Sequence, residues 1–495
     1  MGLRILYCLA LMLVATGATV LIAFSGRMLA PQYGLPPTLW TVILSSSFAG
    51  LSLGLWKGAR QTGTSDNPVK ARRFAAWGLA LLAFWALLEP IIEGWVAIPA
   101  IALENPLIYV AGWVALWLFL PPFLVIGWVM SLLIGLTLTG LPDQRLPWLG
   151  RALGAATAGI PVGLLLAEFL FKAHLGISAT LSSLVGLFAV LALFLALGDS
   201  LRAVLLVALL GGVSQLPAAW AWPTGCDLEH RDGCLGVGIP SRNAGDFRTV
   251  KLNGAAKGAV NPKDLSLLYD NRDRFINAMV GQQIGMDRPP RSLILDGGAS
   301  PLPRAWAKKH FGRSPAGVFL VSDPTPSVSR MAELHFGFRE SPTIQLDHRD
   351  GRLLVQSLPA VGGIELVIGA PNLLPHQLTR EFNDALVKRL DPDGVYLLPV
   401  NDHAADPRLL VHLVKTLQVT FPRVDVWRHE DDHDRRDYVI RAANSVLPPP
   451  PVEIVGWTSW PRADLHARTE SPNVTILSDD HAPIQALLGY PVPKM

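Results

Sequence analysis

Hydrophobic residues are distributed in two different ways along this chain. From Ile5 to Ala221 they form long apolar stretches, each near the roughly 20 residues that a helix needs to cross a bilayer. From Pro223 to Met495 short apolar runs alternate with polar segments, as in a globular domain. The pattern predicts a transmembrane domain at 1–222, a linker with a small β-element at 223–290, and an α/β domain at 291–495.

Seven apolar stretches are predicted to be membrane-spanning helices. The fourth contains Pro121 and Pro122, so it is one kinked helix or two short ones, and we favour one because neither half reaches a full span. The first is interpreted as a retained helix rather than a signal peptide, since more spans follow it. The predicted spans are Ile5–Phe24, Leu39–Trp56, Phe74–Val96, Leu107–Leu138, Ala152–Phe171, Ser178–Leu197 and Leu201–Ala221.

Basic residues of the short loops are divided unevenly between the two sides of these spans. Only Arg27 and Lys172 lie on the side away from the N-terminus. Because the side richer in Lys and Arg is normally cytoplasmic, we expect a cytoplasmic N-terminus, and seven spans then put the soluble half outside the cytoplasm. Nine residues lie on the side of the N-terminus: Arg4, Lys57, Arg60, Lys70, Arg72, Arg73, Arg145, Arg151 and Arg202.

Strands and helices alternate in the soluble half, which predicts a mostly parallel, doubly wound sheet closed by an antiparallel hairpin at its edge. This is the layout of a class I methyltransferase-like Rossmann domain. The expected strands are Arg248–Leu252, Leu293–Leu295, Val318–Val321, Thr343–Leu346, Leu366–Ile368, Val395–Pro399, Val424–Arg428 and Tyr438–Ala442. The expected helices are Asp264–Val280, Pro303–His310, Pro326–Phe336, Thr379–Arg389 and Pro407–Phe421.

Composition agrees with a chain that is half membrane protein. Of its 495 residues 50% are hydrophobic and 16% charged, with a mean hydropathy of +0.35. A net charge of +3 argues against a nucleic-acid partner. Three cysteines exclude a disulfide scaffold. Cys226 and Cys234 either pair in an oxidising compartment or remain two thiols near the membrane surface.

Few ionisable residues lie within the predicted spans. Glu89 and Glu93 are one helical turn apart in the third span, and Glu168 lies near the end of the fifth. One interpretation is a polar pathway or cation site, and the other is that Glu93 and Glu168 reach water at the interface. Trp220 and Trp222 are interpreted as interfacial anchors.

The strongest candidate for ligand binding follows the strand Leu293–Leu295, where the chain reads Asp-Gly-Gly-Ala-Ser-Pro-Leu-Pro-Arg from Asp296. A buried strand that runs into a glycine turn and a helix brings backbone N–H groups close to a nucleoside ligand. The candidate ligand-binding residues are Gly297, Gly298, Asp323, Asp350 and Gly351, and the other interpretation is that they serve only as turn and fold determinants.

Several motifs in a fixed order resemble the spermidine synthases (polyamine aminopropyltransferases), in particular the membrane-fused bacterial branch. In the membrane half they are Gly26-Arg27-Met28-Leu29-Ala30-Pro31 with Gly34, Trp40-Thr41 and Gly50 through Gly54. In the soluble half they are Gly297–Arg304, Asp323-Pro324, Asp350-Gly351-Arg352, Leu378–Phe382, Leu390–Val395 and Asp479–Pro483. The resemblance covers nearly the whole chain. It implies a bacterial inner-membrane protein, with the soluble domain in the periplasm by the charge count above.

The chain departs from this family where catalysis is expected. Aminopropyl transfer needs an acidic group at the end of the fourth strand, and Ile368-Gly369-Ala370-Pro371 has none. The acidic residue that holds the ribose is replaced by Val321, which accepts no hydrogen bond from its side chain. We assign no catalytic residue and no cofactor, and expect a degenerate module with a nucleoside or polyamine ligand. The alternative is an active enzyme that uses decarboxylated S-adenosylmethionine as co-substrate with putrescine.

Two further polar clusters are interpreted as structural. The segment from His429 to Asp434 contains metal-ligand residue types but falls where the edge hairpin turns, so we predict a solvated loop and no metal site. Asn401-Asp402-His403 follows the fifth strand at the edge where ligands bind in such sheets. It either assists chemistry or caps the next helix, and we favour capping.

Overall fold

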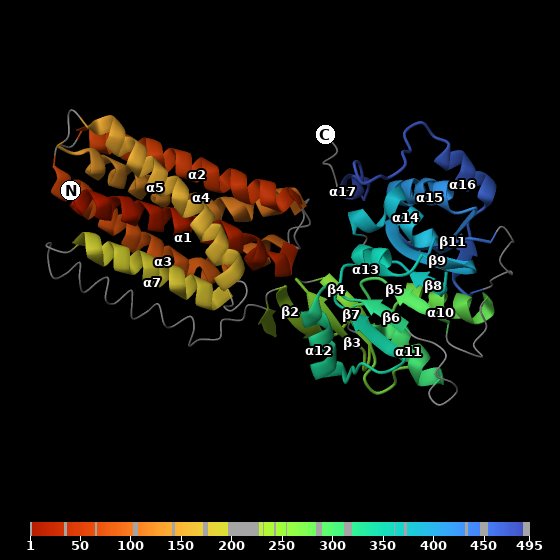
Figure 1. The fold of residues 1–495 in the computed structure, drawn as a ribbon. Coiled ribbons are helices and arrows are strands. Elements are labelled where there is room, and N and C mark those ends of the chain that lie inside the picture. Colours follow the sequence, from red (N-terminus) through yellow and green to blue (C-terminus); the bar gives the residue numbers. More distant parts are fainter. Residues whose placement is uncertain are drawn as a thin grey trace. The chain divides into compact units, whose positions relative to one another are not determined.

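The chain folds into two compact units in a computed structural model (Figure 1). One comprises Met1–Gly236 with Leu252–Ala255, here the helical unit, and the other comprises Val237–Lys251 with Ala256–Met495, here the α/β unit. The structure describes residues 2–33, 37–64, 67–101, 107–140, 144–171, 177–196, 227–230, 232–241, 244–253, 255–283, 290–310, 319–360, 362–370, 374–430, 434–445 and 454–488.

Six of the seven predicted spans fall within helices of the helical unit (Figure 1). The stretch Leu107–Leu138 is a single helix that contains both prolines, as favoured above. The seventh stretch, Leu201–Ala221, and the tryptophans 220 and 222 lie outside the described residues. The helices are α1 (Gly2–Tyr33), α2 (Pro37–Thr64), α3 (Pro68–Ile101), α4 (Leu107–Leu138), α5 (Arg145–Leu165), the π-helical η1 (Leu166–Phe171) and α7 (Ile177–Ala196).

Four of these helical segments are long and apolar enough to cross a membrane. They are Gly2–Gly26, Ala115–Leu138, Arg145–Phe171 and Ala179–Ala196. Length and composition therefore support membrane association of the helical unit. Glu168 is exposed within η1, and the side chains of Glu89 and Glu93 lie outside the described ones.

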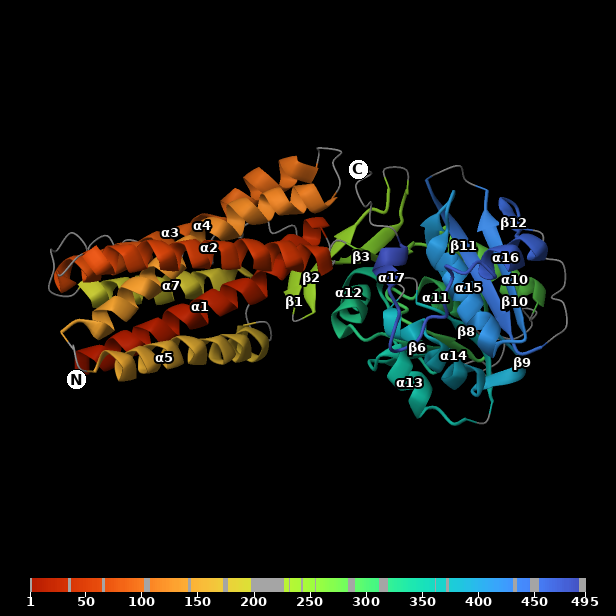
Figure 2. The ribbon, with the colours of Figure 1, turned by 90° about the horizontal axis from the view of Figure 1, so that it is seen from above.

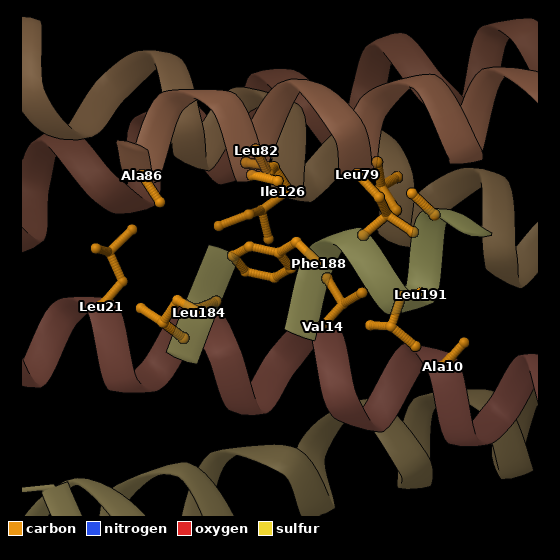
Figure 3. Close-up of a cluster of buried hydrophobic side chains, with 14 of the residues drawn as sticks. Ala10, Val14, Leu21, Leu79, Leu82, Ala86, Ile126, Leu184, Phe188 and Leu191 are labelled. Carbon is orange, nitrogen blue, oxygen red and sulfur yellow. The ribbon is translucent and has the colours of Figure 1, made fainter. Parts of the chain in front are cut away.

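Apolar side chains from α1, α3, α4 and α7 meet inside the helical unit. Figure 3 shows Val14, Leu79, Ile126 and Phe188 within one buried cluster. Small residues bring the helix backbones close together elsewhere. An added Cβ at Gly54 of α2 would lie 2.0 Å from the Leu124 carbonyl oxygen of α4. Such close approach through glycines is a common way of packing helices in membranes.

A four-stranded sheet follows in the chain, in the order β1 (Leu228–His230), β2 (Gly233–Gly238), β3 (Arg248–Leu252), β4 (Ala255–Val260). β1 and β2 are antiparallel. Cys234 in β2 is disulfide-bonded and Cys8 is a free thiol. Cys226, the expected partner of Cys234, lies outside the described residues, so the pairing itself stays a prediction.

The α/β unit contains an eight-stranded sheet in the order β12-β10-β11-β9-β8-β5-β6-β7. The strands β7, β6, β5, β8 and β9 are parallel, whereas β11, β10 and β12 extend the sheet with antiparallel pairs. The predicted parallel sheet and closing hairpin are therefore both present. The strands are β5 (Ser292–Ile294), β6 (Phe319–Ser322), β7 (Ile344–Asp347), β8 (Ile364–Ile368), β9 (Leu390–His403), β10 (Arg423–His429), β11 (Arg435–Ala443) and β12 (Trp457–Ser459).

Helices cover both faces of this sheet, as expected for a doubly wound fold (Figures 1 and 2). Leu354, Phe382 and Leu413 share one core with strand residues such as Tyr438. The helices of this face are α13 (Gly351–Ser357), α14 (Arg380–Val387) and α15 (Arg408–Thr420), with α16 (Arg462–Thr469) and α17 (Ile484–Leu487) near its end. Those of the other face are α10 (Asn271–Gln283), α11 (Pro301–His310) and α12 (Pro326–Phe336).

Two elements of this unit have bounds that differ clearly from the predicted ones. The helix expected from Asp264 begins only at Asn271, because Asp264 accepts the Ser266 N–H (3.0 Å) in a local turn and Asp270 accepts the Arg272 N–H (2.8 Å) as a cap. The strand expected to end at Pro399 continues to His403, because β11 pairs with all of β9 from Val395 to His403.

Candidate functional site

The order of the parallel strands reverses between β5 and β8, which is the position where open α/β sheets bind ligands beyond the carboxyl ends of their strands. A cavity of about 290 Å³ opens at this position. Ile294–Gly297, Ile368, Gly369 and Pro399 contribute the strand-end wall. The remaining walls come from β3 and β4, from residues 269–276 at the start of α10, and from Pro301–Pro303 of α11. All lining residues belong to the α/β unit.

A buried ion pair lies in the wall of this cavity. The Lys257 ammonium on β4 is 3.0 Å from a carboxylate oxygen of Asp296, and the two side chains are 13% and 4% exposed. Asp296 lies in the turn directly after β5 and has a left-handed backbone with φ 48°. The negative charge that the sheet presents at its switch point is thus neutralised by a lysine of the same chain.

The glycine loop, Gly297 to Ser300, is hydrogen-bonded to neighbouring backbone of the same chain. The Ala299 N–H donates to the Lys257 carbonyl (2.8 Å) and the Gly297 N–H donates to the Ser322 carbonyl (3.0 Å). Gly298 has φ +54°, and a Cβ there would lie 2.2 Å from the Lys257 carbonyl oxygen. Close packing requires glycine at these positions. Because the N–H groups of Gly297 and Ala299 already donate to carbonyls of the chain, the loop has fewer N–H groups for a ligand than the sequence indicates.

Of the five predicted ligand-binding residues, only Gly297 lines the cavity. Asp323 is 1% exposed and accepts hydrogen bonds from the Ser329 hydroxyl and the Thr325 N–H. Burial raises the pKa of Asp323 to about 6, an effect that these hydrogen bonds oppose and nearby Asp296 reinforces. The carboxyl group therefore supports the start of α12.

Asp350 and Gly351 also serve the fold. Asp350 caps α13 by accepting the Arg352 N–H (2.8 Å), and its other oxygen is 2.8 Å from His376 Nε2 and 3.2 Å from Gln377 Nε2. Burial alone would raise the pKa of Asp350, but the contacts with His376, Arg352 and Gln377 hold it below its ordinary value. A ligand role for Asp323, Asp350 or Gly351 stays a prediction, since neither aspartate nor Gly351 lines the cavity.

A second charged group at the cavity comes from the start of α10. Arg272 makes a two-pronged contact with Asp270, with N···O distances of 3.0 and 2.8 Å, and lies 3.6 Å from Asp437 of β11. Asp273 also lines the cavity, and its carboxyl group forms no hydrogen bond or ion pair within the described part of the chain. Burial, then the neighbouring Asp270 carboxylate, raise the pKa of Asp273 to about 7, against the opposing charge of Arg272.

The carboxyl end of β8 carries no acid in its described part. Gly369 packs so closely that an added Cβ would lie 2.5 Å from Leu398 Cδ1, and Ala370 is 3% exposed. The absence of a carboxylate here agrees with the departure seen in the sequence. The cavity also contains charged residues that the sequence did not indicate, because each is only a charge near an apolar run: Lys257, Arg272 and Asp273.

The polar clusters of the sequence fall elsewhere. Asp402 is fully buried and accepts the Leu410 N–H (2.9 Å) in the first turn of α15, which is the capping role favoured above. Asn401 bridges β9 to β11 by donating to Asp437 (2.8 Å). Residues 429 and 434 flank the β10–β11 hairpin turn, whose residues 431–433 lie outside the described ones.

No family model and no curated protein matches the chain. Among solved structures it is similar to a probable spermidine synthase from Corynebacterium glutamicum ATCC 13032, with 16% identity, a TM-score of 0.40, and coverage of 49% of this chain and 92% of that one. It is also similar to spermidine synthase from Thermotoga maritima (16% identity, TM-score 0.32, coverage 46% and 78%). A third is human methyltransferase-like protein 13 in complex with SAH, with 19% identity, a TM-score of 0.31, and coverage of 41% of this chain and 91% of that one. Likeness at this level assigns no activity, and the Rossmann-like fold of the α/β unit rests on its own strand order.

Proposed function

We propose that this protein is a membrane-anchored, spermidine synthase-like protein whose α/β unit binds a nucleoside-type ligand and has lost aminopropyl transfer. The order of its sequence motifs supports the family, and the cavity at the sheet's switch point supports ligand binding. The single observation that carries the loss of catalysis is the strand-end wall. Asp296 is neutralised by Lys257, and β8 ends in Gly369 and Ala370 with no base.

A missing general base typically costs on the order of 10²–10⁴-fold in rate. The missing ribose acceptor at Val321, which is fully buried, weakens nucleoside binding in addition. We therefore expect no measurable aminopropyl transfer to putrescine or spermidine by the full-length protein in detergent. A product assay by mass spectrometry, run beside calorimetric titration with 5′-methylthioadenosine, tests the two parts separately. Heat of binding without product supports the proposal, and steady product formation contradicts it.

One observation favours the active alternative. Asp273 lines the cavity, and its pKa of about 7 suits a group that exchanges a proton near neutral pH. If the protein proves active, Asp273→Asn should abolish transfer while titration with 5′-methylthioadenosine is unchanged. Asp264→Asn, at an exposed turn outside the cavity, is the matched control and should leave transfer intact. Loss of transfer in both variants would assign the effect to folding.

A further inference from the structure

The ends of several helices meet at one end of the helical unit. The Arg4 guanidinium at the start of α1 donates to the Thr139 carbonyl just after α4 (3.2 Å). Thr62 near the end of α2 packs against Gly135 of α4. A Cβ added to Gly135 would lie 2.5 Å from the Thr62 methyl carbon. Since α3 begins soon after α2 ends, and α5 soon after α4 ends, these termini share the same end of the unit.

This end is rich in cations and poor in acids. The described stretches 2–33, 37–64, 67–88, 107–140 and 144–167 contain no Asp or Glu. The acids of the adjoining loops, Asp66, Asp143 and Asp199, lie outside the described residues. The basic residues near this end include Arg4, Lys57, Arg60, Lys70, Arg145 and Arg151. The local charge is therefore positive, because these basic residues outnumber the three loop acids.

Two of these arginines are placed around one indole ring. Trp148 of α5 is 5% exposed, with the Arg151 guanidinium carbon 4.7 Å and the Arg4 guanidinium carbon 5.9 Å from its ring centroid. Cation–π contact holds each arginine there, but two like charges at one ring repel each other. No described carboxylate forms an ion pair with either arginine. A pair of guanidinium groups is suited to hydrogen-bond the oxygens of one phosphate.

Apolar side chains on the face of α5 that carries Arg151 are exposed further along the helix. Val162 and Leu165, three and four turns after Arg151, are 38% and 57% exposed. They lie on the segment Arg145–Phe171, which is long and apolar enough to cross a membrane. A ligand with a phosphate at the helix start and hydrocarbon along the helix would contact both features. Free phosphate would use only the first.

We infer that Arg4, Trp148 and Arg151 form a binding site for the headgroup phosphate of an anionic phospholipid, whose acyl chains lie along α5. Clusters of basic residues at the end of a membrane helix attract anionic lipids, and aromatic side chains at the same level anchor the helix in the interface. The inference is independent of the ligand of the α/β unit.

The test uses the full-length protein in a non-ionic detergent, with phosphatidylglycerol as the probe. Its binding is measured by native mass spectrometry and by the shift in thermal unfolding temperature. Arg151→Gln should weaken phosphatidylglycerol binding roughly five- to tenfold. Arg145→Gln removes the same charge from the same helix, but among the described residues only Arg4 and Arg151 contact the Trp148 ring. This control should therefore bind nearly as well as the wild type.

Phosphatidylcholine and inorganic phosphate are tested in the same two measurements. Each should bind more weakly than phosphatidylglycerol and raise the unfolding temperature less. Arg4→Gln provides a second variant should Arg151→Gln not fold, and we expect the same weakening from it. Equal phosphatidylglycerol binding by wild type and both variants would overturn the inference. So would an equal loss in Arg145→Gln, which would indicate diffuse charge, or equal stabilisation by inorganic phosphate.

Discussion

Lys257 and Asp296 are oppositely charged side chains that face each other at the carboxyl end of β5, nearly out of contact with water. A charge in such a position depends on its partner, because removing one member leaves the other buried and uncompensated. The same pair gives the cavity a wall that is neutral overall. A cationic ligand would have to displace Lys257 before it reached the Asp296 carboxylate.

We expect Lys257→Met to destabilise the protein by about 3–5 kcal/mol, because it leaves the Asp296 carboxylate buried without its cation. Asp296→Asn should have a similar effect, because it leaves the Lys257 ammonium buried without its anion. The double variant should lose less than the sum of the two, which is the signature of a direct interaction. Chemical unfolding of the full-length protein in detergent, followed by tryptophan fluorescence, measures all three. Strictly additive losses would show that the pair is not coupled.

The raised pKa of Asp323 makes a separate prediction about pH. In the unfolded chain this carboxyl has its ordinary pKa of 3.8, whereas burial raises it to about 6 in the folded protein. Between about pH 4 and 6 the folded state therefore binds more protons, so stability falls as pH rises through this window. The contribution amounts to about 3 kcal/mol.

Asp323→Asn removes the titrating group while its side-chain oxygen can still accept a hydrogen bond. The difference in unfolding free energy between wild type and variant should shift in favour of the variant from pH 4 to pH 6, then level off. A set of unfolding curves at pH 4, 5, 6 and 7 measures it. Parallel dependence of the two proteins on pH would contradict the assignment.

At the level of elements, the seam between α2 and α4 is made of glycines that face backbone. We expect Gly54→Ala to destabilise the helical unit by roughly 1–3 kcal/mol, because its Cβ would lie 2.0 Å from the Leu124 carbonyl oxygen. Gly186→Ala on α7 is the matched control, since a Cβ there meets nothing within 4 Å. Thermal unfolding in detergent compares them. Equal stability of the two variants would exclude a tight α2–α4 seam.

Elements with local signals were predictable from the sequence. The helix α12 has the predicted bounds because Pro326 opens it and Gly337, with φ +59°, ends it in a left-handed conformation. The extension of β9 to His403 was not predictable, since it depends on pairing with β11, a strand more than thirty residues later. Local propensity carries no information about such pairing.

The candidate site shows the same division. The sequence identified the glycine turn and the absence of a base after β8, because both are features of contiguous residues. It did not identify Lys257, whose role arises when β4 packs against the glycine loop 40 residues away along the chain. It assigned Asp323 and Asp350 to a ligand, which stays a prediction, and it did not indicate that their carboxyl groups support α12 and α13. From the sequence alone, a polar residue after a strand is equally compatible with binding a ligand and with capping the next helix.

For the whole molecule, the number of spans decides which side of the membrane carries the α/β unit. The described helices provide six crossings if each of α1, α2, α3, α4, α5 and α7 spans the bilayer, and Leu201–Ala221 would provide the seventh. The excess of basic residues near the start of α1 favours a cytoplasmic N-terminus. An even number of spans would return the chain to the cytoplasm, and an odd number would leave the α/β unit outside it.

Fusions at two positions separate these cases. A fluorescent protein fused after Leu197, following six helices, should fluoresce, and alkaline phosphatase fused there should be inactive, because the predicted topology puts this fusion point in the cytoplasm. After Met495 the outcome should reverse if Leu201–Ala221 crosses the membrane, since phosphatase folds only in an oxidising compartment. The disulfide of Cys234 favours that compartment as well. Fluorescence without phosphatase activity at both positions would place the α/β unit in the cytoplasm, where the active-transferase alternative would have its nucleoside substrate.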